Sequence, residues 1–199
     1  METEEMKLQV ISHFSHRHPL ELVEVEEEDD DQVNICSGCE VQILGSAYNC
    51  TKPSCDFILH HSCIDLPRKV KHNSHPKHPL ILHFFPPYGD GEFTCNACGN
   101  PGHGFTYHCM SCKYDLHVEC ASLPEVEYHE DHEHPFVLSY SFRLQNKAEG
   151  KGKGKGKAVA EEAELKDFEC YVCHGPVEKG CWAYSCSSCY YCAHLECVN

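Results

Sequence analysis

Residues 95–120 read CNACGNPGHGFTYHCMSCKYDLHVEC and carry two C-x2-C pairs followed by an H-x2-C pair. The six residues of these pairs are Cys95, Cys98, Cys109, Cys112, His117 and Cys120. Cysteine and histidine at such spacings bind zinc, and a structural zinc ion takes four of them in a tetrahedron. Six ligands are too many for one zinc site and too few for two, so two further ligands must come from elsewhere in the chain.

The same pattern occurs again on both sides of this stretch. The upstream copy consists of Cys36, Cys39, Cys50, Cys55, His60 and Cys63, and the downstream copy consists of Cys170, Cys173, Cys186, Cys189, His194 and Cys197. Tyr-x-Cys recurs at Tyr48, Tyr107 and Tyr184, and Leu-Pro follows the last cysteine of the first two copies, at residues 66–67 and 123–124. A pattern repeated in this way indicates a tandem array of one structural unit.

Three histidine triplets recur in phase with the cysteines, and each ends in His-Pro followed by Leu or Phe. The triplets are His13, His16 and His18; His72, His75 and His78; and His129, His132 and His134. Two histidines from each triplet would complete eight ligands, and therefore two zinc sites, per unit. The sequence leaves open which two they are, and whether the first histidine serves its own unit or the preceding one. Because His13 has no preceding unit and the third unit stops just after Cys197, ligation within the same unit is favoured.

Short apolar stretches follow the triplets. Residues 20–25, 80–84 and 136–140 include runs in which apolar and polar side chains alternate, as they do along a half-buried strand. We therefore predict one short strand leading each triplet into its unit.

The organisation of the 199 residues follows from these repeats. We predict modules at 13–67, 72–124 and 129–199, preceded by an acidic lead-in over residues 1–12 and interrupted in the third module by a disordered Lys/Gly insert at 143–167. Units of this size bury too small a core to be stable alone, whereas zinc binding contributes roughly 10 kcal/mol or more to the folding of small zinc domains. The metal-free chain is therefore expected to be largely unfolded.

The 17 cysteines could instead form disulfides. Five cysteines per unit leave Cys181 and Cys192 over in the third unit, and histidines are part of the repeated spacing, which favours metal over disulfides. The opening METEEMKLQV has neither the basic nor the apolar region of a signal peptide. We expect a reducing compartment, the cytosol or the nucleus, in which Cys181 and Cys192 are spare small residues rather than ligands.

The charge of the chain bears on its partners. A formal net charge of −15 disfavours binding to nucleic-acid phosphates and to anionic membrane surfaces. An acidic run between residues 24 and 31 is interpreted as a solvated loop, with a docking patch for a basic partner as the alternative. The composition thus favours a protein partner, whose identity the sequence does not give.

Taken together, the repeated pattern resembles the plant DC1 domain family, which consists of divergent relatives of the C1 domain of protein kinase C. The shared string runs H-x2-H-x(1,2)-H-P-[LF], C-x2-C, Tyr-x-C-x2-C, aromatic-x-Leu-H-x2-C and Leu-Pro, and it covers nearly all of residues 13–197 except the Lys/Gly insert. The resemblance implies three small zinc-stabilised α+β modules, each with short antiparallel strands, one short helix near the last ligands and two interleaved zinc sites. It therefore implies six Zn²⁺ per chain.

The resemblance also assigns the ligands. One site of each module would consist of Cys36, Cys39, His60 and Cys63; of Cys95, Cys98, His117 and Cys120; and of Cys170, Cys173, His194 and Cys197. The other would consist of Cys50 and Cys55, of Cys109 and Cys112, and of Cys186 and Cys189, each pair with two histidines of its triplet. The chain lacks the final cysteine of the parent C1 pattern, so a histidine must take that place.

Three functions are compatible with these features. We expect a non-enzymatic adaptor with no catalytic residues, which presents its modules to protein partners in intracellular stress or hormone signalling. The C1 relatives suggest diacylglycerol or lipid binding as an alternative, which the acidic charge opposes. The C-x2-C pairs suggest thiol–disulfide exchange as a further alternative, but they lack the βαβ context of a reductase.

Overall fold

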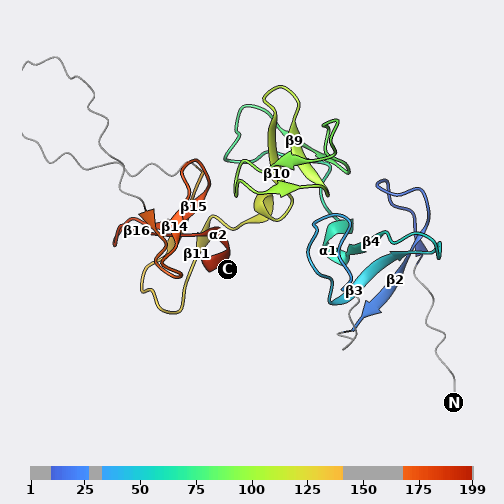
Figure 1. Ribbon diagram of the computed structural model, residues 1–199, viewed down its shortest axis with the longest axis horizontal. Coiled ribbons are helices and arrows are strands. Elements are labelled where there is room, and N and C mark those ends of the chain that lie inside the picture. Colours follow the sequence, from blue (N-terminus) through green and yellow to red (C-terminus); the bar gives the residue numbers. More distant parts are fainter. Residues whose placement is uncertain (1–9, 27–32, 141–167, 199) are drawn as a thin grey trace, which may run out of the picture. The chain divides into compact units, whose positions relative to one another are not determined.

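The computed structural model describes residues 10–26, 33–140 and 168–198, which form three four-stranded antiparallel sheets and two two-stranded ones (Figure 1). The chain divides into two compact units, one ending at Leu123 and the other beginning at Pro124. The first unit contains two of the four-stranded sheets, and the second contains the third. Helices are few and short, as the α+β expectation implies.

The first sheet has the order β1-β2-β3-β4. Its strands are β1 (Val10–Ile11), β2 (Leu20–Val25), β3 (Gly45–Cys50) and β4 (Ile58–His60), and helix α1 (His61–Ile64) follows directly. Strand β2 pairs with β3 along its whole length, from Leu20 opposite Cys50 to Val25 opposite Gly45. Strand β2, which follows the first histidine triplet, is thereby held against β3, which ends at Cys50.

The second sheet repeats this arrangement with the order β10-β9-β6-β5. Its strands are β5 (Lys69–Val70), β6 (Leu80–His83), β9 (Thr106–Cys109) and β10 (Tyr114–His117), followed by the 3-10 helix η1 (Cys120–Ser122). Strands β7 (Phe93–Thr94) and β8 (Pro101–Gly102) form a separate two-stranded sheet.

The third sheet, in the second unit, has the order β11-β12-β15-β16. Its strands are β11 (Val126–Glu127), β12 (Phe136–Ser139), β15 (Ala183–Cys186) and β16 (Tyr191–Ala193), followed by α2 (Leu195–Val198). Strands β13 (Phe168–Glu169) and β14 (Pro176–Val177) again form a two-stranded sheet. The strands expected at 20–25, 80–84 and 136–140 are present in all three sheets, the last two ending one residue earlier.

The three sheets begin three residues before the predicted starts of the modules. Strands β1, β5 and β11 open the three sheets, and each lies before the residue at which we placed the start of its module, namely 13, 72 or 129. Val10 and Ile11 pair with Glu21 and Leu20, so they belong to the first sheet rather than to an acidic lead-in. Two-residue strands carry too little alternation to be recognised from sequence.

The accessory motifs found in the sequence meet in space. The Tyr107 hydroxyl donates a hydrogen bond to the carbonyl oxygen of Pro67 at 2.8 Å, and the Tyr184 hydroxyl donates to that of Pro124 at 2.8 Å. Burial raises the pKa of both hydroxyls to about 12. Tyr107 and Tyr184 thus fasten the second and third sheets to the Leu-Pro segments that precede them.

The turns after the C-x2-C pairs share one backbone conformation. The residue after the second cysteine has a positive φ in five of them, at Glu40, Gly99, Lys113, His174 and Tyr190. Its amide donates to the carbonyl oxygen of the first cysteine, at 2.8–2.9 Å. Such a turn brings the two cysteines of a pair onto one side of the loop, where both can face a single ion.

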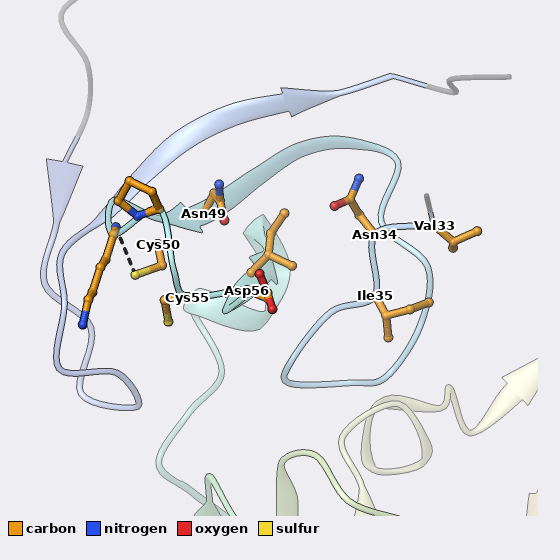
Figure 2. A pocket seen from close by; sticks show the side chains of 10 residues that line it. Val33, Asn34, Ile35, Asn49, Cys50, Cys55 and Asp56 are labelled. Carbon is orange, nitrogen blue, oxygen red and sulfur yellow. Dashed lines mark hydrogen bonds between the residues drawn. The ribbon is translucent and has the colours of Figure 1, made fainter. Parts of the chain in front are cut away.

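The pair formed by Cys50 and Cys55 is spaced by two additional residues and closes differently. The Cys55 amide donates to the carbonyl oxygen of Lys52 at 3.0 Å, and a cavity of about 400 Å³ lies beside the loop. Figure 2 shows Cys50 and Cys55 on one side of this cavity and Val33, Asn34 and Ile35 on the other. The longer loop between Cys50 and Cys55 thus contributes Lys52 and Pro53 to the wall of the cavity.

Part of what was predicted lies outside the described residues, namely residues 1–9 of the lead-in, most of the acidic run and the Lys/Gly insert. Among the helices of the described ranges, none has the length and apolarity needed to span a bilayer.

Candidate metal centres

The fold gathers the cysteines and histidines of the repeats into groups of four. In each group the candidate ligand atoms lie within 4.8 Å of one another. Five groups are His16, His18, Cys50 and Cys55; Cys36, Cys39, His60 and Cys63; His75, His78, Cys109 and Cys112; Cys95, Cys98, His117 and Cys120; and His132, His134, Cys186 and Cys189. Cys170, Cys173, His194 and Cys197 contact one another in the same way as the second and fourth groups do.

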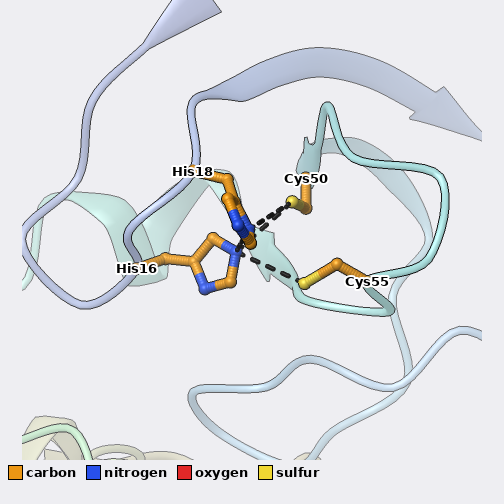
Figure 3. Close-up of side chains that lie close together, drawn as sticks. All are labelled: His16, His18, Cys50 and Cys55. Atoms are coloured by element: carbon orange, nitrogen blue, oxygen red, sulfur yellow. Dashed lines mark hydrogen bonds between the residues drawn. The ribbon is translucent and has the colours of Figure 1, made fainter.

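The groups that use the triplets take their second and third histidines. His16 Nε2 lies 3.3 Å from Cys50 Sγ and 3.4 Å from Cys55 Sγ, and His18 Nδ1 lies 3.1 Å from His16 Nε2. Figure 3 shows these four side chains converging on one point. The other two groups repeat this, with His78 Nδ1 at 3.2 Å from Cys112 Sγ and His134 Nδ1 at 3.3 Å from Cys189 Sγ.

The surroundings of two ring nitrogens indicate that a cation fits these groups. The Nε2 atoms of His75 and His132 are buried and have no hydrogen-bond partner. A buried polar atom without a partner costs about 1–3 kcal/mol, so such atoms are rare in stable proteins. A cation held among the four ligand atoms would supply the missing partner, and two thiols with two imidazoles suit Zn²⁺.

The first histidine of each triplet lies outside the groups. His13 Nδ1 is 2.6 Å from Ser15 Oγ and its Nε2 is 3.2 Å from the carbonyl oxygen of Ile64. His72 Nδ1 is 2.8 Å from Ser74 Oγ, and the Asp131 amide donates to His129 Nδ1 at 3.2 Å. The sequence kept all nine histidines as candidates, whereas the structure places these three in the turn that presents the second histidine.

That turn is the same in the three triplets. The amide of the second histidine donates to the carbonyl oxygen of the first, at 3.1 Å for His16, 3.0 Å for His75 and 3.0 Å for His132. Each triplet also lies beside the cysteines of its own sheet, so ligation of the preceding unit by a first histidine finds no support in the geometry.

The groups that include the H-x2-C pair orient their imidazole through its other nitrogen. His60, His117 and His194 direct Nδ1 at a cysteine sulfur at 3.2, 3.4 and 3.3 Å. Their Nε2 atoms bind the carbonyl oxygens of Gln42, Pro101 and Pro176 at 3.1, 3.2 and 2.9 Å. A carbonyl acceptor on one ring nitrogen fixes the tautomer that leaves the other free for a metal, as is usual for metal-binding histidines.

Backbone amides point at the cysteine sulfurs of the same groups. The amides of Gly38 and Ala97 donate to Cys36 Sγ and Cys95 Sγ, both at 3.4 Å. The amides of His60, His117 and His194 donate to the first cysteine of their groups, also at 3.4 Å. Amide donors stabilise a thiolate and leave its remaining lone pairs for a cation.

Thiols within one group change one another's pKa. Hydrogen bonds from the thiols of Cys39 and Cys63 lower the pKa of Cys36, whereas donation to Cys36 raises the pKa of Cys63 to about 12. In the second unit, burial together with the thiols of Cys173 and Cys170 raises the pKa of Cys197 to about 12. Because neighbouring thiolates repel one another, a cation held among them would stabilise several thiolates in one group.

Cys192 stands apart from these groups. It lies in β16, buried, where its thiol donates to the carbonyl oxygen of Glu169 at 3.4 Å, and burial raises its pKa. It fills a core position between Tyr191 and Ala193, consistent with a spare small residue.

Comparison with known proteins places these groups in a family. The model of the C1 domain family matches residues 14–64 and 73–121, which together make up half of the chain. The chain belongs to the C1 domain family. The match includes the four Cys/His groups of the first two sheets but not strands β1 and β5. It confirms the DC1-type resemblance stated from the sequence and supports zinc as the metal of these C1 domains.

A curated relative is similar to part of this chain. Probable nucleoredoxin 1 of Arabidopsis thaliana is 42% identical over 57 residues, which is 29% of this chain. The aligned part is only 9% of that relative's length. No solved structure matches the chain.

Proposed function

We propose that the protein is a non-enzymatic zinc-binding adaptor. Three tandem C1-type modules would each hold two zinc ions and present surface loops to a protein partner in intracellular signalling, of the stress or hormone type suggested by the DC1 resemblance. The third module extends the family beyond the matched residues, and it is supported by the third sheet, whose strand order and Cys/His groups repeat those of the first two.

The observation that carries this proposal is the complete ligand set of each group. Zinc held by four protein ligands has no open position for water or substrate, which is the arrangement of structural rather than catalytic zinc. When bound, zinc would supply cross-links between segments far apart in the chain. The protein's own residues hold the thiolates with amide hydrogen bonds and fix the imidazole tautomers with backbone carbonyls.

Two measurements test the proposal. Metal analysis of the purified chain should give six zinc ions per chain, and two or three would contradict two sites per module. A pull-down with zinc-loaded chain, compared with chelated chain, should recover a protein partner only in the loaded state. The same partner recovered equally from chelated chain would argue against folded modules as the binding surface.

Lipid binding is a second candidate, favoured by one surface. Val33, Ile35, Val41 and Leu44 are exposed on two segments that are joined by the bridge between Ile35 and Gln42. Apolar loop tips of this kind can enter a bilayer, but the net charge of −15 opposes approach to anionic lipid. Flotation with neutral vesicles containing diacylglycerol decides between the two: zinc-dependent co-flotation, lost in Val41→Asp, would establish lipid binding.

Thiol–disulfide exchange is a third candidate because of the relative's name. The aligned segment is a small part of that protein, and in this chain the C-x2-C cysteines belong to four-residue groups in turns. We expect insulin reduction no faster than with the thiol buffer alone. Faster reduction by the zinc-loaded chain would establish this activity instead.

A further inference from the structure

The first two sheets are joined at a contact between a metal-binding turn of one and a loop of the other. Gly38 and Glu40 belong to the turn that carries Cys36 and Cys39, and residues 103–105 connect strand β8 to strand β9 of the second sheet. The Phe105 amide donates to the carbonyl oxygen of Gly38 at 2.7 Å, and the His103 amide donates to Glu40 Oε2 at 2.8 Å.

The contact is closely packed. A Cβ atom on Gly104 would lie 2.3 Å from the carbonyl oxygen of Gly38, and one on Gly38 would lie 3.1 Å from the Phe105 ring and from Leu59. Glycine at position 104 is what allows the two backbones to approach this closely, whereas a Cβ at position 38 would require small shifts of the Phe105 and Leu59 side chains. Gly104 immediately precedes Phe105, the aromatic residue before strand β9. The corresponding residue of the third repeat, immediately before Trp182 and strand β15, is Cys181.

Aromatic side chains extend the contact along the linker. The Phe84 ring lies 5.3 Å from the Phe105 ring and 4.7 Å from that of Phe14, which belongs to the first sheet's triplet. The Arg68 guanidinium, from the linker between the sheets, lies 4.5 Å from the Phe14 ring centroid and 5.6 Å from that of Phe84. A cation above two aromatic rings favours one fixed arrangement of the linker.

Two metal centres face this contact. A cavity of about 340 Å³ is walled by Cys39 of the group Cys36–Cys39–His60–Cys63 and by His117 and Cys120 of the group Cys95–Cys98–His117–Cys120. Glu119 lines the same cavity, with its carboxyl within hydrogen-bonding reach of the Cys39 thiol although its side chain is exposed. Residues of both centres therefore line the same cavity.

A short chain of bonds connects the centres. A metal ion on Cys36 and Cys39 would fix the turn that offers the Gly38 carbonyl and the Glu40 carboxylate to residues 103–105. Those residues continue strand β8, whose Pro101 carbonyl orients His117 through its Nε2 atom. Emptying one centre would loosen its turn and thereby loosen the ligand support of the other.

We propose that the first two sheets form one metal-dependent body in which these two facing centres bind and release zinc together. This rests on the proposed zinc-binding role. The coupling is a property of the contact at Gly38 and Gly104, so it can be removed without changing any ligand.

The test compares the full-length zinc-loaded chain with its Gly104→Ala variant, with Gly89→Ala as control because a Cβ at Gly89 meets nothing within 4 Å. A chelator is added, cysteines freed over time are alkylated, and labelling is mapped to the peptides containing Cys36 and Cys39, Cys95 and Cys98, and Cys170 and Cys173. In wild type and Gly89→Ala the first two peptides should be labelled with one common rate constant. In Gly104→Ala their rates should separate by roughly tenfold, while the third peptide keeps its rate.

Hydrogen exchange gives a readout that does not depend on zinc release. In the zinc-loaded wild type the amides of His103 and Phe105 should be protected, and Gly104→Ala should speed their exchange roughly tenfold. Glu40→Asn, which suits a positive φ but has a side chain one methylene shorter, should speed exchange of the His103 amide more than that of Phe105. This second variant keeps the proposal testable if Gly104→Ala does not fold.

The outcomes separate the two proposals. A chain purified without zinc contradicts the proposed function. A zinc-loaded chain in which the two peptides are labelled at unrelated rates in wild type, or at equal rates in Gly104→Ala, overturns the coupling and leaves zinc binding intact. Unprotected His103 and Phe105 amides in the wild type overturn it as well.

Discussion

At the scale of single residues, the direction of each imidazole decides which side chains can hold a metal. The histidines of the H-x2-C pairs use Nδ1, and their Nε2 atoms are bound to carbonyl oxygens such as that of Pro101. In the triplets, His16 offers Nε2 and His18 offers Nδ1. These directions depend on the local turn, so neighbouring histidines in one triplet have different roles.

The triplet yields the first prediction. His75→Ala should remove one zinc ion per chain, because it deletes the buried Nε2 that faces Cys109 and Cys112. His72→Ala should keep the full zinc content, since the His72 ring binds Ser74 instead. Zinc content measured by native mass spectrometry distinguishes the two variants, and equal loss in both would contradict the assignment.

Gly102 yields the second prediction. A Cβ at this position would lie 2.5 Å from His117 Nε2 and 2.6 Å from Phe93 Cζ, so Gly102→Ala should displace the imidazole from its carbonyl acceptor. Loss of such support lowers metal affinity by about 10–100-fold. Competition with a chromogenic chelator should show this loss for the His117 centre and for the coupled centre at Cys36, with Gly89→Ala behaving as wild type. Unchanged competition in Gly102→Ala would mean that His117 does not bind metal through this orientation.

At the scale of elements, the second and third sheets are each held to the preceding segment by a tyrosine hydroxyl. Tyr107 and Tyr184 are buried, and their hydroxyls donate to the carbonyl oxygens of Pro67 and Pro124. The strands opened by these segments are only two residues long, so they contribute little stability by themselves. The hydroxyl therefore matters for the position of β5 and β11.

The third prediction concerns this hydrogen bond. Tyr184→Phe should lower the free energy of unfolding of the zinc-loaded chain by about 1–2 kcal/mol, because it leaves the Pro124 carbonyl without its donor. Urea unfolding followed by tyrosine and tryptophan fluorescence measures the change. Tyr128→Phe, at a side chain that is 71% exposed, is the control and should be neutral. An effect of equal size in the two variants would argue against a stabilising role for the hydrogen bond between Tyr184 and Pro124.

At the scale of the whole molecule, the apolar core of each sheet is small. The first sheet buries Leu20, Ala47, Tyr48 and Leu59, and the third buries Phe136, Ala183, Tyr184 and Ala193. Cysteines of the metal groups account for many of the other buried positions, including Cys36, Cys95 and Cys170. Metal binding is therefore expected to supply much of the folding free energy.

The fourth prediction follows directly. Removal of zinc by a chelator under reducing conditions should abolish the far-ultraviolet signal of the sheets and make the chain sensitive to protease, and added zinc should restore both. Acidification should have the same effect, because the ligating thiolates must take up protons as the pH falls. A chelated chain with an unchanged spectrum and unchanged protease resistance would mean that the sheets do not depend on metal.

Much of this arrangement could be predicted from the sequence, because the repeated spacing constrains it. Spacing identifies the candidate ligands and alternation predicts the strands after the triplets, whereas the division of the ligands into six groups was implied by the DC1 resemblance. The choice between His13 and His16 could not be made, because it depends on the direction of ring nitrogens within a turn. The pairing of Tyr107 with Pro67 joins residues 40 positions apart, and no local pattern indicates such a contact.

The hydrogen bonds from Tyr107 to Pro67 and from Tyr184 to Pro124 also bear on where the chain can be cut into fragments. A fragment of the second sheet that starts at His72 would lack β5 and the acceptor of Tyr107, and one of the third sheet that starts at His129 would lack β11 and the acceptor of Tyr184. Cutting before Pro67 or before Pro124 keeps the acceptor and the opening strand with the sheet that uses them. Fragments trimmed to the first histidine would therefore understate how well each unit holds together by itself.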